Sequence, residues 1–179
     1  MRFTKCRVAG AYVIDIEPRD DERGTFARTF CAKSFRDLGL DYDISQCNVS
    51  YSPTRGTLRG LHYQAAPDEE TKLVRVTRGK AFDVAVDLRP DSPTYLGWDG
   101  IELDSDRRNA FYIPSGCAHG VLTLEDATEI FYQMSAPYAP ESASVARWDD
   151  PAFGIAWPFN PIVISDRDAT CPFYRSKDP

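Results

Sequence analysis

Long apolar segments are absent from this chain of 179 residues. No stretch approaches the roughly 20 apolar residues that cross a bilayer, which argues against a membrane-spanning helix. The N-terminal region contains basic residues, as a signal peptide does. The acidic residues Asp15 and Glu17 follow too soon for an apolar stretch of signal-peptide length. We therefore expect a protein that stays in the cytoplasm and does not bind a membrane.

Paired cysteines and an excess of positive charge are also missing. The five cysteines are odd in number and form no C-x-x-C pair, which argues against a disulfide framework or a zinc knuckle. The net charge is −6 and the pI is near 4.9, so a basic surface for nucleic acid is not expected. A nucleotide diphosphate is still compatible with this charge, because a few arginines can bind phosphate locally in an acidic protein.

Glycine-rich phosphate loops and internal repeats do not occur either. The chain contains neither G-x-G-x-x-G nor a P-loop sequence, so we expect no dinucleotide cofactor. The 13 prolines and 11 glycines are spread along the chain and mark no linker. A chain of this length can bury a sizeable core, and we predict a single domain over residues 1–179.

Short strand-like segments make up most of what is present. Residues 80–88 show the alternation of a strand with one buried face. Large apolar residues stand at every second position, namely Phe82, Val84, Val86 and Leu88, and the positions between them hold alanine or aspartate, namely Ala81, Asp83, Ala85 and Asp87. Further strands are expected over 56–64, 72–78, 96–103, 110–113, 120–124 and 129–134. Short strands separated by turn residues predict an all-β sandwich or jelly roll.

Helical patterns are rare in this sequence. One short helix is predicted over residues 31–38, where Phe35 and Leu38 share a face and Gly39 supplies a stop. After Pro137 the pattern becomes irregular and proline-rich. We expect a C-terminal extension, about residues 137–179, that packs on the barrel.

The chain has two histidines, His62 and His119, and either could be an ordinary structural residue. Their surroundings match the two halves of the cupin pattern: Gly56, five residues and His62-x-Gln64, then Pro114-x-Gly116-x-x-His119. Metal-binding cupins carry a second histidine where this chain has Gln64, and a neutral amide is a poor ligand for iron, zinc or manganese. Glu69 could supply an acidic ligand. We therefore expect no metal, and keep a metal-dependent cupin as an alternative.

Two further polar residues are predicted to point into the barrel. Lys72 shares strand parity with Val74 and Val76, and Tyr132 shares it with Ile130 and Met134. Lysine is rarely buried without a partner or a task, although Lys72 could also reach solvent at a strand end, and most buried tyrosines only pack. A base, a lysine and a phenol together suit removal of a proton next to a carbonyl, with stabilisation of the enolate and reprotonation.

A longer resemblance contains these residues and covers about residues 7–172. The segments that carry it are ERGTFARTF (22–30), SQCNVSYS (45–52), GTLRGLHYQ (56–64), KLVRVTRGKAFDVAVDLR (72–89), YIPSGCAHGVLTL (112–124), FYQMSAPYAPE (131–141) and RWDDPAFGIAWP (147–158). Together they resemble the dTDP-4-dehydrorhamnose 3,5-epimerase family. The resemblance implies a cupin-type jelly roll with a few short helices, and an isomerase that inverts C3, C5 or both in a nucleotide-linked 4-keto-6-deoxy sugar without a cofactor.

The resemblance also implies roles for individual residues. His62 matches the general base, Asp168 its carboxylate partner, Lys72 the group that stabilises the enolate, and Tyr132 the acid on the opposite face. Matches to substrate-binding positions are Arg23, Phe26, Gln46, Asn48, Arg59, His119, Tyr138 and Arg167. In the family an N-terminal strand crosses to a neighbouring subunit, which implies a homodimer in which Arg23 and Phe26 act in the partner's site.

Four positions depart from the family pattern and leave the nucleotide base open. They are Arg28 and Ala143, where glutamate is common, together with Val49 and Gln133. A changed charge alters which hydrogen-bonding edge of a nucleotide base the site accepts. The nucleotide could therefore be dTDP, UDP, CDP or GDP. The competing functions are a 3,4-ketoisomerase of a related sugar, a metal-dependent cupin such as a dioxygenase, and a sugar-binding cupin without activity.

Overall fold

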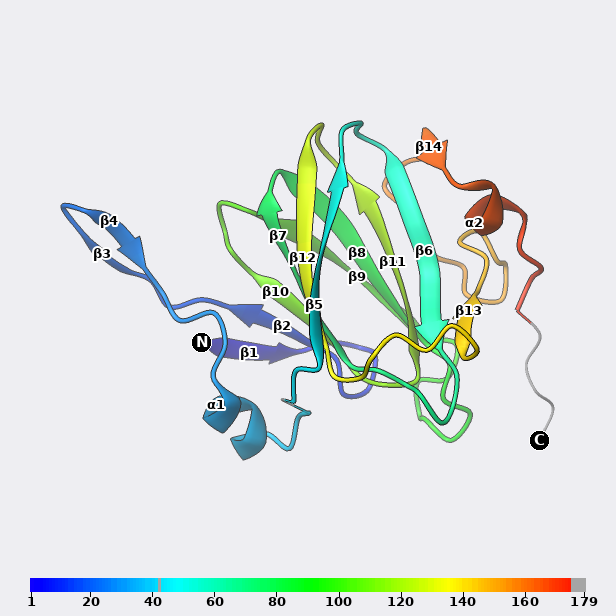
Figure 1. Ribbon diagram of the computed structural model, residues 1–179, viewed down its shortest axis with the longest axis horizontal. Coiled ribbons are helices and arrows are strands. Elements are labelled where there is room, and N and C mark those ends of the chain that lie inside the picture. Colours follow the sequence, from blue (N-terminus) through cyan, green and yellow to red (C-terminus); the bar gives the residue numbers. More distant parts are fainter. Residues whose placement is uncertain (42, 175–179) are drawn as a thin grey trace.

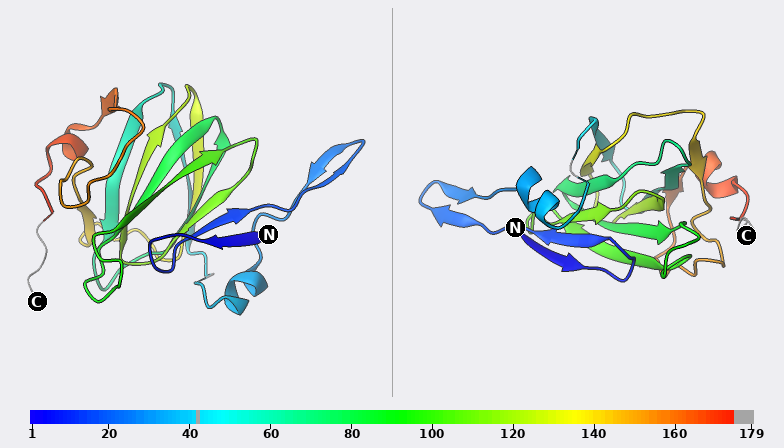
Figure 2. Two further views of the ribbon diagram at one scale, coloured as in Figure 1. Left: turned by 180° about the vertical axis from the view of Figure 1, so that it is seen from behind. Right: turned by 90° about the horizontal axis from the view of Figure 1, so that it is seen from below.

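The computed structural model describes residues 1–41 and 43–174, which form two β-sheets facing one another with a hairpin projecting from one side (Figures 1 and 2). The first sheet has the order β1 (Arg2–Lys5), β2 (Tyr12–Asp15), β10 (Ala110–Ile113), β7 (Lys72–Arg78), β12 (Thr128–Met134), β5 (Gln46–Ser52). The second has the order β13 (Ala143–Val145), β6 (Thr57–Gln64), β11 (Cys117–Thr123), β8 (Lys80–Asp87), β9 (Trp98–Asp104), and β14 (Val163–Ile164) pairs with β6. The structure confirms the expected all-β, cupin-type jelly roll.

The projecting hairpin consists of β3 (Arg19–Asp21) and β4 (Gly24–Phe26), and two short helices complete the described chain. Helix α1 (Ala32–Asp37) agrees with the prediction over 31–38, and it ends where Gly39 adopts a φ of +69° and donates to the carbonyl of Arg36. Phe35 is buried, whereas Leu38, the C-cap residue three positions later, is 45% exposed. Helix α2 (Asp166–Thr170) was not predicted, because five residues are too few for a helical period to show.

The strand predictions need modest corrections at their ends. The segments predicted over 56–64, 96–103 and 120–124 form β6, β9 and β11, and β11 begins three residues earlier than expected, at Cys117. The predicted strands 72–78 and 110–113 have the observed bounds of β7 and β10. Strands β1 to β5, β13 and β14 were missed, since several are only two to four residues long and lack a full alternating pattern.

Strand β8 is buried on both faces, which contradicts the expected single buried face. Val84 and Val86 lie in one apolar cluster, while Ala81 and Ala85 lie in another, and Asp83 is fully buried. The second face is covered because Ala146, Phe153 and Trp157 from the chain after β13 pack against Val84, Val86 and Leu61. The alternation in the sequence therefore separates two environments that are both shielded from water.

Residues 137–142 cross from the first sheet to β13, and residues 146–174 then run along the outer side of the second sheet (Figure 1). Strands β13 and β14 both pair with β6. Asp150 anchors this segment by accepting from the backbone N–H groups of Ala152 and Tyr174. The last five residues of the predicted extension, 175–179, lie outside the described residues. In the part of the chain that the structure describes, neither helix has the length or apolar character needed to span a bilayer.

Candidate active site

A pocket of about 490 Å³ opens between the two sheets. It is lined by most of the residues that the sequence singled out: Gln46, Asn48, Arg59, His62, Lys72, His119, Tyr132, Tyr138 and Arg167. Strands β5, β7 and β12 supply residues from the first sheet, and β6 and β11 supply residues from the second. A molecule bound here is therefore contacted by opposed sheets on opposite sides.

His62 lies on β6 and is paired with Asp168, although 106 positions separate them in the chain. His62 Nε2 is 2.9 Å from Asp168 Oδ1. An ionised carboxylate only accepts hydrogen bonds, so this contact places the proton on Nε2 and leaves Nδ1 of neutral His62 as a basic nitrogen. The pair therefore sets the tautomer that a general base requires.

Two local features hold Asp168 against β6. Ser165 caps α2 by accepting from the backbone N–H of Asp168, and the backbone N–H of Gly60 donates to Asp168 Oδ2 at 3.1 Å. Gly60 has a φ of +124°, and a Cβ at this position would lie 2.6 Å from the Cα of Gly120 on β11. The glycine in LRGLH thus allows β6 to approach β11 closely while its N–H reaches the carboxylate.

The pocket lowers the pKa of His62 below its ordinary value. The largest cause is loss of water around the ring, and electrostatic interactions with Lys72 and His119 act in the same direction. The hydrogen bond and negative charge of Asp168 raise the pKa and offset part of this effect. His62 is consequently neutral and able to accept a proton at pH 7.

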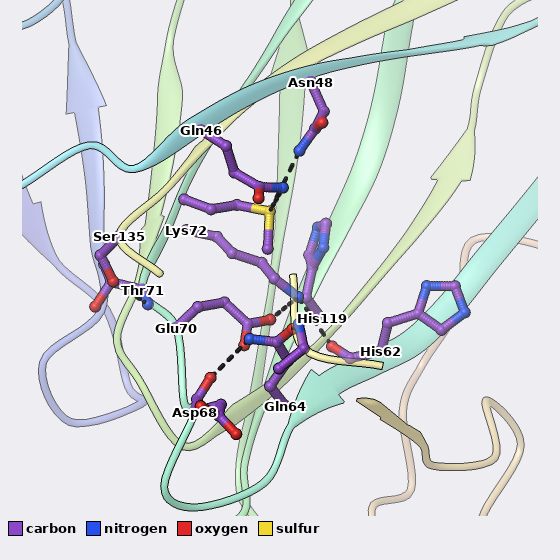
Figure 3. A network of polar contacts seen from close by, with 12 residues as sticks. Gln46, Asn48, His62, Gln64, Asp68, Glu70, Thr71, Lys72, His119 and Ser135 are labelled. Carbon is purple, nitrogen blue, oxygen red and sulfur yellow. Dashed lines mark hydrogen bonds and ion pairs between the residues drawn. The ribbon is translucent and has the colours of Figure 1, made fainter. Parts of the chain in front are cut away.

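Lys72 begins β7 and reaches across to the opposite sheet (Figure 3). Its side chain is buried; Nζ lies 3.0 Å from Glu70 Oε1 and donates to the backbone carbonyl of His62 at 3.1 Å. An ammonium group has three N–H donors, and two of them are directed to these acceptors. The third can donate to an oxygen in the pocket.

Tyr132 lies on β12, in the sheet opposite the one that carries His62. Burial raises the pKa of its phenol above the ordinary value, and the nearby positive charge of Arg59 offsets part of this rise. The phenol therefore keeps its proton at neutral pH. A neutral imidazole and a protonated phenol therefore face one pocket from opposed sheets.

His119 lines the same pocket and forms a second histidine–carboxylate pair. Its register partner across β11 and β6 is His62, and its Nε2 is 3.0 Å from each oxygen of the fully buried Asp83 on β8. The contact fixes the orientation of the imidazole ring. His119 can therefore present its other ring nitrogen to a bound molecule in a fixed direction.

The mouth of the pocket is held by two glutamines. Gln46 accepts from the backbone N–H of Tyr138 at 3.0 Å, and Gln64 accepts from the backbone N–H of Ala139 at 2.7 Å. The amide of Gln64 also donates to the carbonyls of Asp68 and Pro137. These contacts hold the segment bearing Tyr138 between β5 of the first sheet and β6 of the second.

The same contacts bear on the metal-dependent alternative. The position that holds a metal-binding histidine in other cupins is Gln64, and its amide oxygen and nitrogen are both engaged with the backbone. Glu69, the proposed acidic ligand, is exposed and does not line the pocket. Among the described residues no group of three or more His, Cys, Asp or Glu side chains is placed to hold a metal ion.

Two predicted site residues do not reach the pocket of their own chain. Arg23 and Phe26 lie in the β3–β4 hairpin, where Phe26 is 73% exposed and Arg23 pairs with Asp21. Of the four departures from the family pattern, Ala143 lines the pocket, Val49 and Arg28 are exposed, and Gln133 lies on the other face of β12 from Tyr132. Ala143 is therefore the departure that directly changes the wall of the site.

Two carboxylates near the site were not predicted as site residues: Glu70 lines the pocket, and Asp83 does not line it but pairs with His119. Glu70 shares parity with Lys72, and Asp83 interrupts an otherwise apolar inward series with Ala81 and Ala85. Both are buried, and Glu70 Oε2 has no hydrogen-bond partner within residues 1–41 and 43–174. Leaving a buried acceptor unpaired costs on the order of 1–3 kcal/mol, which marks Glu70 as a residue that needs explanation.

Comparison with known proteins gives a consistent result. Residues 5–176 match the family model described as dTDP-4-dehydrorhamnose 3,5-epimerase. A protein of that name from Methanothermobacter thermautotrophicus is 45% identical, with 93% of this chain and 91% of the relative covered. The crystal structure of the enzyme from Elizabethkingia anophelis superposes with a TM-score of 0.94 at 34% identity, covering 99% of this chain and 98% of the other.

A further solved structure contains ligands. The Bacillus anthracis dTDP-4-dehydrorhamnose 3,5-epimerase, with TDP and PPi bound, is 35% identical and superposes with a TM-score of 0.92, covering 97% of this chain and 99% of the other. Identity at this level over nearly the whole of both chains shows common family membership. The chain belongs to the dTDP-4-dehydrorhamnose 3,5-epimerase family and is a carbohydrate epimerase.

Proposed function

We propose that this enzyme inverts C3 and C5 of a dTDP-linked 4-keto-6-deoxyhexose. The observation that carries the proposal is the placement of a neutral histidine and a protonated tyrosine on opposed sheets of one pocket, which a lysine ammonium also lines. Inversion requires a proton to leave one face of a carbon and another to arrive on the opposite face. Relatives named for this reaction, one of them with TDP bound, support the nucleotide assignment.

The proposed reaction begins with proton transfer from the carbon next to the ketone to Nδ1 of His62. The electron pair of the broken C–H bond forms the enolate, and its negative charge develops on the O4 oxygen, to which Lys72 donates its third N–H. Tyr132 then protonates the same carbon from the other face. Solvent returns a proton to the phenolate and takes one from His62, and the sequence is repeated at the second carbon without a metal or cofactor.

Polar residues around the mouth suit the nucleotide part of the substrate. Arg59 and Arg167 are exposed beside the pocket and provide charge-assisted donors for a diphosphate. Gln46 and Asn48 on β5 and Tyr138 on the fastened segment line the same opening. We assign these five residues to nucleotide and sugar binding, and His119 to a contact with the sugar.

The function is tested first with the unmodified enzyme. In thermal-shift measurements dTDP should raise the melting temperature more than UDP, CDP or GDP, because the ligand that binds the folded state most tightly stabilises it most. When the enzyme acts on the dTDP-linked 4-keto sugar in heavy water, deuterium should enter C3 and C5. NMR measures this incorporation. If no nucleotide-linked 4-keto sugar exchanged its hydrogens, only a binding role would be left. A product in which the ketone has moved would indicate the 3,4-ketoisomerase. Stoichiometric metal in the purified protein would favour the metal-dependent cupin.

The pH dependence of kcat/KM should report the His62–Asp168 pair. Because the pKa of His62 is below about 6.5 and the neutral form is active, the rate should be level near pH 7 and fall as the pH drops below 6.5. Asp168→Asn removes both contributions that raise this pKa, so the acid limb should move to lower pH. The plateau should also fall, because an amide can donate to Nε2 and select the wrong tautomer. An acid limb that stays in place or moves upward would contradict the assignment.

We also propose a homodimer in which the N-terminal hairpin of each chain completes the partner's site. The hairpin projects away from the body and carries Phe26 at 73% exposure, an arrangement that leaves a large apolar side chain in water in a single chain. Val49 and Tyr51 on β5 are 60% and 49% exposed and provide further apolar surface at the sheet edge. A two-fold interface would cover both regions in each copy.

Subunit mixing should test this arrangement directly. Arg23→Ala and His62→Asn should each impair activity alone, but a hybrid dimer has one site with both His62 and the partner's Arg23. Random exchange should therefore restore up to about a quarter of wild-type activity. Mixing His62→Asn with Lys72→Met is the control, because both residues come from one chain and no complete site can form. A monomer by light scattering, or no recovery after exchange, would refute the dimer proposal.

The proposed location is the cytoplasm. All five cysteines are free thiols in the structure, including the exposed Cys47. Free thiols are typical of proteins in a reducing compartment.

A further inference from the structure

Glu70 is a buried carboxylate beside the reacting groups that the proposed reaction does not use. Its side chain is 3% exposed, and Oε1 lies 3.0 Å from the ammonium nitrogen of Lys72. The residue comes two positions before β7, and Figure 3 shows its side chain directed toward the tip of Lys72. The carboxylate and the ammonium thus form an ion pair in the wall of the pocket.

The second oxygen of Glu70 identifies what the carboxylate can contact. Oε2 is inaccessible to solvent and has no hydrogen-bond partner among the described residues. A buried carboxylate is stable only when it is paired, and Lys72 supplies that pairing through Oε1. Since Oε2 is closed off from the pocket, direct binding of a sugar hydroxyl by this oxygen does not account for the residue.

Lys72 needs such a partner for geometric reasons. Lysine carries a compact charge on a flexible four-carbon chain, so one hydrogen bond leaves its ammonium free to rotate and shift. The carbonyl of His62 provides one contact at 3.1 Å, and Glu70 provides the second at 3.0 Å from another segment. Two fixed acceptors determine the position of Nζ and the direction of its remaining N–H.

We propose that Glu70 is a positioning residue that holds the ammonium of Lys72 where it meets the enolate oxygen. The inference rests on the role proposed above for Lys72. It makes Glu70 a participant in the rate of epimerisation that acts through Lys72 and does not touch the substrate. Placing the Glu70 carboxylate beside Lys72 leaves its Oε2 buried without a hydrogen-bond partner among the described residues, which is unfavourable for stability.

Glu70→Gln tests the proposal by keeping the shape of the side chain and removing its charge. We expect kcat to fall about 10- to 100-fold, the range that follows when a reacting group is misplaced by about an ångström. KM and the affinity for dTDP should change little. The matched control is Glu69→Gln, the same change at the exposed neighbouring residue, which should behave as wild type.

A double-mutant cycle separates positioning from a general structural role. If Glu70 acts only through Lys72, the Glu70→Gln, Lys72→Met double variant should be no slower than Lys72→Met alone, whereas independent effects would multiply. Thermal unfolding and circular dichroism check the fold of every variant. Should Glu70→Gln fail to fold, Glu70→Asp replaces it, since the shorter side chain keeps the charge but draws it away from Nζ and should also lower kcat.

The outcomes distinguish this inference from the proposed function. Wild-type kcat in Glu70→Gln, together with an inactive Lys72→Met, would overturn the role of Glu70 and leave the reaction intact. A raised KM with unchanged kcat would make Glu70 a binding residue and overturn the inference as well. Full activity in Lys72→Met would instead remove the role proposed for the lysine.

Discussion

His62→Asn should abolish epimerisation, with kcat falling by about 10³-fold or more and no deuterium entering C3 or C5 from heavy water. The base contributes on the order of 10²–10⁴-fold by itself, and asparagine has no nitrogen that accepts a proton at neutral pH. The amide is close in size to imidazole and can still hydrogen-bond to Asp168, so the fold should persist. Activity is measured by NMR of the product and of the exchanged positions.

The matched control is His119→Asn, which alters the other histidine of the same pocket. His119 is paired with Asp83 and is assigned to binding, so this variant should raise KM by about tenfold while exchange continues. Comparable loss of exchange in both variants would mean that the base is not His62 alone. Continued exchange in His62→Asn would refute its role as the base.

Tyr132→Phe should separate proton removal from proton return. The variant retains His62 and Lys72, so the carbon next to the ketone can still exchange its hydrogen with solvent through the enolate. Protonation from the opposite face loses its donor, and formation of the inverted product should fall by about 10²–10⁴-fold. The expected signature is deuterium in recovered substrate without a corresponding amount of epimer.

Tyr12→Phe provides the comparison, because Tyr12 lies on β2 and packs against the apolar cluster around Phe35, and it does not line the pocket. This variant should keep both exchange and inversion. If Tyr132→Phe inverted the sugar at the wild-type rate, the acid would have to be another group. If it lost exchange as completely as His62→Asn, Tyr132 would be needed for the first step and the division of roles would be wrong.

Much of the sandwich was predictable because strand periodicity is local. The bounds of β7 and β10 follow from short alternating or apolar runs bordered by turn residues. Periodicity did not distinguish a solvent-facing side of β8 from one covered by residues 146–157, because that covering segment lies some 60 residues away in the chain. Helix α2 escaped notice for a different reason, since a single turn held by Ser165 has no repeating apolar face.

In the candidate site, too, local sequence patterns indicated some side chains, and contacts between distant segments decided the others. Parity allowed Lys72 and Tyr132 to point into the barrel but did not decide between the pocket and other surroundings, and the structure shows that both line the pocket. Asp168 came only from the family resemblance, since nothing near it in the chain points to a histidine 106 positions earlier. Glu70 was passed over in favour of Glu69, because one residue of difference decides between the pocket and solvent just before a strand begins.

The sequence by itself determined the all-β class, the strand parity of the lysine and the phenol, and, through family resemblance, the kind of chemistry. These properties depend on residue type and on spacings within single strands. Only the tertiary structure decided which carboxylate pairs with which cation, and that His62 and Tyr132 face one pocket from opposite sheets. The physical reason is that sheet pairing joins segments far apart in the chain, and a desolvated charge takes its properties from the partners that this pairing supplies.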